Sequence, residues 1–387
     1  MVCLVTQYLT ILNKIKTETG EQIVQAFKDI CPSAIEQLSK KTIMDPPKIK
    51  GFCSSKYFTK FGLIYLVQSA MQMCKQAQLF ELTTKVHHLL GPLAEERKLW
   101  KVISQSFASA SISWSAVEQF SSGNDRQLGS YYRVQFQSKP EGVYIYHERL
   151  PQLWSVTPLY VKSAEVLADG KQVEGINEGT ELNEEKMDKN KYYVHVKAVL
   201  PFYPDGESRV TVFEKNNNVQ DFYFDLPFYK GKGKTIENTY LQRTMYHLNH
   251  PIPYMVKRVF VEKENITVTE YSPIQKCCLD LTQIIEKIDE AIAKEDFQAL
   301  QPLLQGALLT QVNDGPKKMA EVFLTGGIEN ENTDKLRKLF RQFLRANSEG
   351  VKLHGQYAST HPVWQVLQEQ LEPGLNDLTS SLQPFLK

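Results

Sequence analysis

The residues from Gly231 to Thr235 come closest to a chemical motif in this 387-residue sequence. Gly233, Lys234 and Thr235 supply the G-K-T that ends a phosphate-binding P-loop, where backbone N–H groups and a lysine hold phosphates. The motif also needs a glycine five positions before Gly233, where this sequence has Phe228. A P-loop opens a helix, whereas this loop lies between two strand-like segments. These residues therefore predict a flexible basic hairpin loop and no nucleotide site.

Other reactive groups lack the spacing that catalysis or metal binding requires. His87 with His88 and His247 with His250 form two pairs, but no third histidine or carboxylate stands near either pair at a known ligand spacing. We interpret these histidines as solvated or capping side chains. The sequence contains no G-x-S-x-G elbow and no paired-carboxylate signature, so hydrolase chemistry is not indicated. No cofactor and no metal are expected.

The cysteines and the charge balance exclude several further classes. No C-x-x-C pair occurs, so the cysteines indicate neither a zinc site nor a redox motif, and we expect reduced thiols. The 45 Lys and Arg residues against 44 Asp and Glu residues give no global field for nucleic acid or a membrane surface. The longest apolar run, Phe61 to Val67, is far shorter than the ~20 residues that span a bilayer. The six cysteines are Cys3, Cys31, Cys53, Cys74, Cys277 and Cys278.

Three regions of different periodicity follow one another along the chain. From Thr6 to Phe120 apolar residues recur at helical spacing, which predicts stacked antiparallel helices. Beyond residues 121–125 they alternate as in strands, and turn clusters such as 204–206 separate short segments, which favours antiparallel sheets. The alternating residues are Tyr132, Val134 and Phe136; Tyr192, Val194, Val196 and Ala198; Val210 and Val212; Phe222 and Phe224; and Val256, Val259 and Val261.

The last region returns to helical periodicity. Ser272 followed by Pro273 is a helix start signal. Further helices are predicted from about Phe297 to Thr310, Lys317 to Leu324, Asp334 to Leu353 and Pro362 to Leu382, which is typical of a helical bundle. The predicted fold class is α+β and mainly α, with a helical-repeat-like region over residues 1–125, antiparallel sheet over 126–270 and a helical bundle over 271–387.

One segment of the last region suggests more than packing. The apolar stretch from Leu303 to Leu309 is followed by Val312 and then by the helix-interrupting Asn313-Asp314-Gly315-Pro316. An apolar residue at such a break either closes the bundle core or is presented to a partner. The pattern alone leaves both open.

This segment resembles the loop-containing helix of the DOCK homology region-2 (DHR-2) domain of the dedicator of cytokinesis (DOCK) family. The matching residues are Gln305-Gly306, Gln311 to Pro316 and Ala320 to Leu324. Other segments match the same domain in chain order, and together they extend from Cys53 to the C-terminus. They are Cys53 to Thr59, Ala77 to Leu82, Tyr131 to Phe136, Arg243-Thr244, Pro253 to Arg258, Ser272 to Ile274 and Phe340 to Phe343.

The resemblance implies a guanine-nucleotide exchange factor for a Rho-family small GTPase, of the Rac or the Rac-like cell-division-control kind. It implies a helical lobe A that stabilises the domain and forms a homodimer through residues 55–95, a sheet lobe B, and a four-helix-bundle lobe C. Val312 would be the nucleotide sensor that displaces Mg²⁺ and GDP, and Asn313, Gly315 and Pro316 would set its direction. The implied GTPase-binding residues are Gln305, Gly306, Leu308, Gln311, Arg243 and Thr244.

The sequence also departs from the family pattern. The first fifty residues match poorly, lobe A is expected to be truncated, and no counterpart of the lipid-binding domain that precedes the exchange domain is expected. We therefore expect a cytoplasmic protein in actin-regulating GTPase signalling that partners recruit to the plasma membrane. The alternative is a scaffold that binds a GTPase or dimerises without releasing nucleotide.

Overall fold

The computed structural model describes most of the chain beyond residue 59. The described residues are 60–121, 128–136, 142–148, 157–165, 172–176, 188, 191–204, 209, 211–254, 257–309, 315–325 and 330–386. The chain divides into two compact units. The first unit comprises Met1–Phe224 with Met245–Thr267, and the second comprises Asp225–Thr244 with Val268–Lys387.

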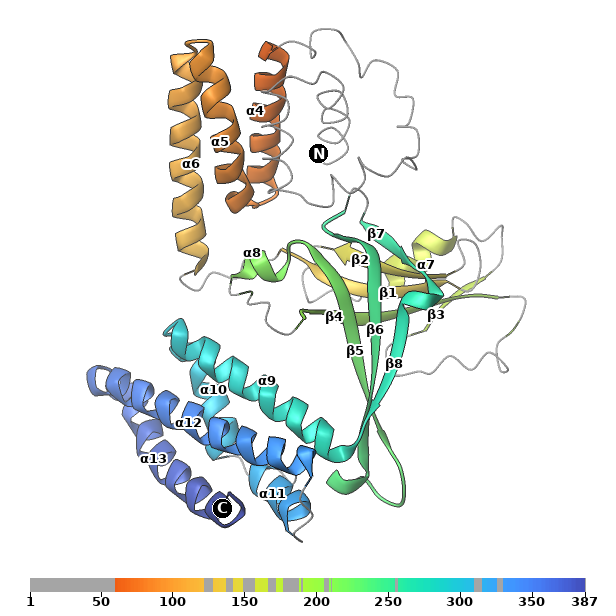
Figure 1. Ribbon diagram of the computed structural model, residues 1–387, viewed down its shortest axis with the longest axis vertical. Helices are drawn as coiled ribbons and strands as arrows, with labels where there is room; N and C mark the ends of the chain where they lie inside the picture. Colours follow the sequence, from red (N-terminus) through yellow and green to blue (C-terminus); the bar gives the residue numbers. More distant parts are fainter. Residues whose placement is uncertain are drawn as a thin grey trace. The chain divides into compact units, whose positions relative to one another are not determined.

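Three helices open the described part of the first unit (Figure 1): α4 (Lys60–Gln76), α5 (Phe80–Glu96) and α6 (Trp100–Ser121). Each is joined to the next by a short turn in which one residue, Gln78 or Lys98, adopts positive φ. Short turns of this kind make consecutive helices pack against each other, as α4 with α5 and α5 with α6 do here. From Lys60 to Phe120 the helices expected from the periodicity are confirmed, and the part of that prediction before residue 60 lies outside the described residues.

Small polar side chains fill part of the α5–α6 contact. Thr83, Ser106 and Ser113 are buried, and His87 is buried with them. The Nδ1 atom of His87 lies 2.5 Å from Oγ of Ser106. The interpretation of His87 as a solvated or capping side chain is therefore wrong, because helix pairing removes it from water, whereas its neighbour His88 is exposed.

An eight-stranded curled sheet follows in the chain. Its strand order is β7-β2-β1-β4-β5-β6-β8, and β3 pairs with β4 in parallel. The pairs β1–β2, β1–β4, β2–β7 and β4–β5 are antiparallel, as the short alternating segments predicted. The strands are β1 (Ser130–Phe136), β2 (Gly142–Glu148), β3 (Val173–Ile176), β4 (Tyr192–Phe202), β5 (Val219–Tyr229), β6 (Thr239–Ile252), β7 (Arg258–Val261) and β8 (Ile266–Tyr271).

Alternating side chains give this sheet a core on each face. One cluster contains Tyr131, Ile145 and Phe222. The other contains Val134 and Val196, which pack with Tyr160 of helix α7 (Thr157–Glu165). Because both faces carry buried apolar residues, the strands read as strongly hydrophobic in sequence.

One predicted strand is a helix. Val212 starts the short helix α8 (Val212–Lys215), in which the Thr211 hydroxyl accepts from the Glu214 backbone N–H and the Glu214 carboxylate accepts from the Thr211 N–H. This reciprocal capping box satisfies two backbone donors within four residues. It outweighs the alternation of Val210 and Val212, which is too short to define a strand. Val210 lies outside the described residues.

The second unit is built on five helices: α9 (Pro273–Ala293), α10 (Phe297–Leu308), α11 (Pro316–Leu324), α12 (Glu331–Thr360) and α13 (Pro362–Leu382). The predicted start of α9 is confirmed, and the Gln275 side chain accepts from the Ser272 backbone N–H at 2.9 Å. Helix α12 extends beyond the predicted end at Leu353 to Thr360. Since the described residues here form five helices, they do not establish the expected four-helix bundle.

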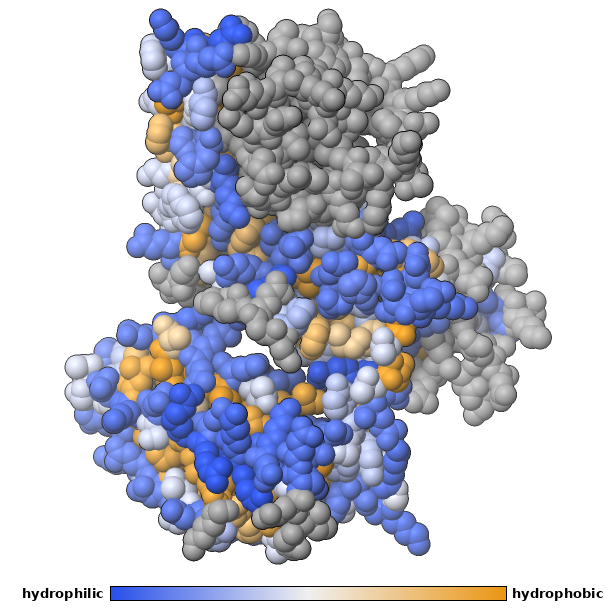
Figure 2. All heavy atoms as spheres, in the orientation of Figure 1, coloured by the Kyte–Doolittle hydropathy of each residue, from blue (hydrophilic) through white to orange (hydrophobic). Residues whose placement is uncertain are grey.

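These helices bury their apolar stripes in one common core. Fully buried members include Leu281, Ile288, Leu300, Leu304 and Phe340. Cys277 and Cys278 are buried in it as free thiols, which confirms their interpretation as packing residues. Figure 2 shows hydrophilic side chains over much of the visible surface of these helices, with hydrophobic patches between them. This is the pattern of amphipathic helices around a shared interior.

Candidate functional site

The helical break expected around Val312 is present. Helix α10 ends at Leu308 and α11 begins at Pro316. Val312 itself lies outside the described residues, as do Gln311 and Asn313. The described part of the candidate site therefore consists of the C-terminal end of α10 and the N-terminal end of α11.

The α10 end is fixed by tight packing against α13. Leu300, Leu304 and Leu308 form the buried face of α10. A Cβ atom placed on Gly374 of α13 would lie 3.0 Å from Cδ2 of Leu309 and 3.1 Å from the Leu308 carbonyl oxygen. The glycine therefore permits the last turn of α10 to approach α13 closely.

The α11 end is fixed by its first residues and by its buried face. Gly315 is the N-cap in an extended conformation, and Pro316 occupies the first helical turn, where its missing N–H costs no hydrogen bond. The Gly315 carbonyl accepts from Met319 N at 3.1 Å, so the helix forms immediately after the break. Ala320 and Leu324 then anchor α11 in the common core.

The predicted GTPase-binding residues of α10 have different surroundings. Gly306 is exposed, and a Cβ atom placed there would meet no atom within 4 Å. Gln305 is partly buried one position earlier. Leu308 belongs to the buried core, so its side chain packs inside the unit. The structure places only the first two at the surface of α10, and contact with a partner stays a prediction for all three.

Arg243 and Thr244, predicted near the same site, are buried on β6. Nε and Nη2 of Arg243 each donate to an Asp225 carboxylate oxygen at 2.7 Å. The guanidinium also lies 5.5 Å from the centre of the Tyr271 ring on β8. Arg243 therefore joins β5, β6 and β8, and its direct contact with a GTPase stays a prediction.

The pairing partner of Arg243 was missed by the sequence reasoning, although the sequence holds a signal for it. Asp225 and Arg243 are 18 positions apart and lie at equal distances from Lys234 in the predicted hairpin loop. Phe228 and Tyr240 are also equally far from Lys234 in sequence, and their rings are 5.7 Å apart. An antiparallel hairpin with the predicted loop 231–235 at its tip would have placed Asp225 opposite Arg243.

The hairpin loop also reaches the helical core. Residues 230–235 are exposed, and Gly231 and Gly233 adopt positive φ, which only glycine does at little cost. The 3-10 turn η3 (Ile236–Asn238) then places Ile236 in the core of α9–α13. Beside it, the pKa of Glu237 is lowered by its own backbone N–H, by the Thr235 hydroxyl and by nearby Lys318 of α11.

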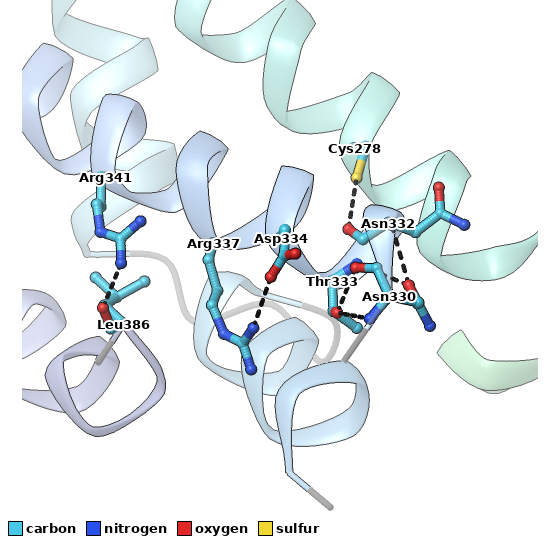
Figure 3. Close-up of polar contacts among 8 residues, drawn as sticks. All are labelled: Cys278, Asn330, Asn332, Thr333, Asp334, Arg337, Arg341 and Leu386. Atoms are coloured by element: carbon cyan, nitrogen blue, oxygen red, sulfur yellow. Dashed lines mark hydrogen bonds and ion pairs between the residues drawn. The ribbon is translucent and has the colours of Figure 1, made fainter. Parts of the chain in front are cut away.

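The start of α12 completes the frame around α11 (Figure 3). The Asn330 side-chain oxygen accepts from Asn332 N and Thr333 N at 3.0 Å, and the Thr333 hydroxyl accepts from Asn330 N at 2.9 Å. About two turns further along, Arg341 donates to the Leu386 carbonyl at 2.6 Å and joins α12 to the C-terminal segment. The Asn330 cap therefore fixes where α12 begins, and Arg341 fixes the C-terminal segment against it.

Nothing in the described part of the chain gathers three His, Cys, Asp or Glu side chains that could hold a metal ion. His247 contacts Asp221 at 2.7 Å, and His250 stacks on the Tyr254 ring. Nor does any described helix combine the length and apolar composition needed to cross a bilayer.

Three family models match the chain in order. They are DHR-2 Lobe A over residues 1–118, DHR-2 Lobe B over residues 179–251 and DHR-2 Lobe C over residues 287–385. The Lobe C match contains the whole of the interrupted helix. The helices and strands of the structure follow the order of these three matches.

Curated proteins similar to the chain include several dedicator of cytokinesis proteins. Dedicator of cytokinesis protein 7 of Mus musculus is 27% identical over 99% of the chain, and protein 8 of Homo sapiens is 26% identical over 94%. Protein 9 of Homo sapiens is 23% identical over 93%. The chain spans about a fifth of the length of these relatives, since the alignments cover 18% of each.

Proposed function

Because the chain belongs to the DHR-2 domain of the dedicator of cytokinesis family, we propose that it is a guanine-nucleotide exchange module for a Rho-family small GTPase. The GTPase is of the Rac or the cell-division-control kind. The observation that carries the proposal is the break between α10 and α11, whose two ends are anchored in one core. A segment held at both ends can present a side chain in a defined direction.

The proposed mechanism requires no covalent chemistry by this chain. A small GTPase holds its nucleotide through the phosphates and through a Mg²⁺ ion that demands octahedral oxygen coordination. Val312 offers no oxygen ligand, so its side chain at the Mg²⁺ position would exclude the ion. The phosphate charges are then poorly compensated, and GDP leaves.

The antagonism between nucleotide and module also explains how the GTP-loaded GTPase is released. If the bound module lowers the affinity of the GTPase for nucleotide by some factor, bound nucleotide lowers the affinity of the GTPase for the module by the same factor. Each tenfold of this antagonism corresponds to about 1.4 kcal/mol. GTP entering with Mg²⁺ therefore expels Val312 and releases the loaded GTPase.

The break supplies the direction of the sensor in this mechanism. Asn313, Gly315 and Pro316 are proposed to set that direction, and the start of α11 at Pro316 supports the role of the last two. Gln305, Gly306 and Gln311 are proposed to contact the GTPase. Leu308, Arg243 and Thr244 are buried, so we assign them mainly to holding that surface in place.

The test is release of a fluorescent GDP analogue from a panel of purified Rho-family GTPases. The chain should accelerate release from one or two of them, and Val312→Ala should lose most of that acceleration while still binding the GTPase. Val363→Ala is a matched control, because this valine lies in the same unit and its side chain is 88% exposed. A Val312→Ala variant that exchanges as fast as the wild type would refute the sensor assignment.

The same experiment decides between exchange and the scaffold alternative. Binding of a GTPase without faster nucleotide release from any member of the panel would favour a scaffold. A homodimer through residues 55–95 remains part of the proposal, and sedimentation velocity of the purified chain tests it directly.

A further inference from the structure

The outer half of the β5–β6 hairpin belongs to the helical unit. Asp225–Thr244 falls in the same compact unit as Val268–Lys387, whereas the inner parts of β5 and β6 fall in the first unit. At the tip of this hairpin, η3 contacts both α9 and α11 (Figure 1). The hairpin tip is therefore part of the structure that surrounds α11.

Ile236 anchors the tip in the helical core. Its side chain is 7% exposed and belongs to the same core as Ala320 of α11. The next residue, Glu237, also senses α11. Its pKa is lowered by its own backbone N–H, by the Thr235 hydroxyl and then by Lys318 in the first turn of α11. Two consecutive residues of η3 thus act on α11, one by packing and one by charge.

Backbone hydrogen bonds within the tip hold Ile236 in one position. The Lys230 N–H donates to the Asn238 carbonyl at 3.0 Å, and the Asn238 N–H donates to the Thr235 carbonyl at 3.1 Å. The Thr239 hydroxyl donates to the same Thr235 carbonyl at 2.7 Å. Because these bonds close the turn on both sides of Ile236, the backbone fixes where its side chain enters the core.

The strands behind the tip are also held in place. Arg243 donates two hydrogen bonds to Asp225, and its guanidinium lies beside the Tyr271 ring at the end of β8. Nearer the tip, Lys230 forms an ion pair with Glu270 of β8. The hairpin is therefore linked along its length to β8, the strand that leads into α9.

Helix α11 depends on neighbours of this kind. It has nine residues, and a helix shorter than about 12 residues is marginal in water unless other elements pack against it. Its buried residues are Ala320 and Leu324, whereas Lys317 and Lys318 of the first turn are exposed. The first turn of α11 therefore takes its position from the elements beside it, and η3 is one of them.

We propose that Ile236 is a positioning residue for nucleotide exchange: the hairpin tip holds the N-terminal end of α11 and thereby sets the direction in which the segment before α11 is presented. The inference rests on the proposed function, because the position of α11 affects nucleotide release only if that segment acts on the GTPase. Ile236 touches neither nucleotide nor Mg²⁺ in this proposal and acts through α11. Its loss should therefore lower the rate of release and leave the affinity for the GTPase unchanged.

Amide hydrogen exchange of the full chain tests the hairpin contact without a GTPase. Ile236→Ala is compared with Ile285→Ala, which removes the same atoms from a side chain that is also 7% exposed, on a helix that packs mainly against α10 and α12. The Met319 amide is measured relative to the Phe340 amide of the same variant, which corrects for any difference in overall stability. We expect this ratio to rise about tenfold more in Ile236→Ala than in Ile285→Ala.

Conservative variants keep the test decisive. Ile236→Leu, which keeps the side-chain volume, should retain most of the protection of α11. If Ile236→Ala does not fold, the pair Ile236→Val and Ile285→Val gives the same comparison with a smaller effect. Equal ratios in the matched variants would show that the hairpin tip does not hold α11, and the proposal would be wrong.

Release of a fluorescent GDP analogue tests the consequence for exchange. Ile236→Ala should lower the maximal release rate by about tenfold and leave the concentration of chain at half-maximal rate unchanged. Ile285→Ala should leave both values close to those of the wild type. Equal maximal rates in the two variants, with an active wild type, would refute the positioning role. A wild type that releases no nucleotide would refute the proposed function instead, and hydrogen exchange would still decide whether the hairpin holds α11.

Discussion

Replacement of Arg243 separates a structural from a binding role at the predicted site. The side chains of Arg243 and Asp225 are 9% and 24% exposed, and two hydrogen bonds of 2.7 Å join them. Arg243→Met leaves the Asp225 carboxylate without its cation. Loss of a fully buried partner costs about 3–5 kcal/mol. Because Asp225 keeps some access to water, we expect the free energy of unfolding to fall by about 2–3 kcal/mol.

The double variant Asp225→Leu with Arg243→Met removes both charges. Since an apolar pair of similar volume can replace a buried ion pair at little cost, most of the lost stability should return. Urea unfolding of the wild type, both single variants and the double variant gives the coupling energy. The exposed pair Lys294 and Glu290 is the control, and its coupling should be below about 0.5 kcal/mol.

The nucleotide-release assay then assigns the role. If Arg243 acts only by holding β5, β6 and β8 together, the stable double variant exchanges nucleotide like the wild type. If the double variant is stable but has lost exchange, at least one of Arg243 and Asp225 contacts the GTPase itself. A single variant Arg243→Met that loses less than about 0.5 kcal/mol would refute the structural reasoning, because it would mean that the ion pair contributes almost nothing.

Two further changes have defined outcomes. Gly306→Ala should raise the free energy of unfolding by up to about 1 kcal/mol, because alanine favours the helix and its Cβ meets no atom there. Slower exchange in this more stable variant would identify Gly306 as a contact residue, whereas unchanged stability in urea would refute the helix argument. The pKa of His195 is about 4 in the folded chain against an ordinary 6.5, so the unfolded chain binds more protons between these values. Stability should therefore fall by about 2–3 kcal/mol as the pH drops from 6.5 to 4, and His195→Gln should flatten this part of the profile.

Several features of the fold follow from short stretches of sequence. The start of α9 at Ser272-Pro273 and the break before Pro316 depend on capping and on proline geometry, which act within a few residues. Helix α13 begins at Pro362 for the same reason, and it ends at Leu382 as predicted. The order of helical and strand regions follows from periodicity, because each period reflects which face is buried.

Errors arose where a distant segment or a local cap decided the outcome. Val212 alternates with Val210 like a strand residue, but the Thr211–Glu214 capping box makes this stretch helical. His87 has polar neighbours at Lys85 and His88, yet packing of α6 against α5 buries it beside Ser106. The end of α12 was placed too early, because its last turns carry His354 and Ala358, which only the fold shows to be buried.

For the candidate site, the sequence determined the family resemblance, the helical break and the identity of Val312, since these are written in contiguous residues. Tertiary structure alone showed that Leu308 and Arg243 are buried. It also placed Arg133 against His195, 62 positions away in the chain. Burial, ion pairing and the pKa of a histidine depend on strand register and helix packing, which bring together segments whose separation in sequence carries no information about their distance in space.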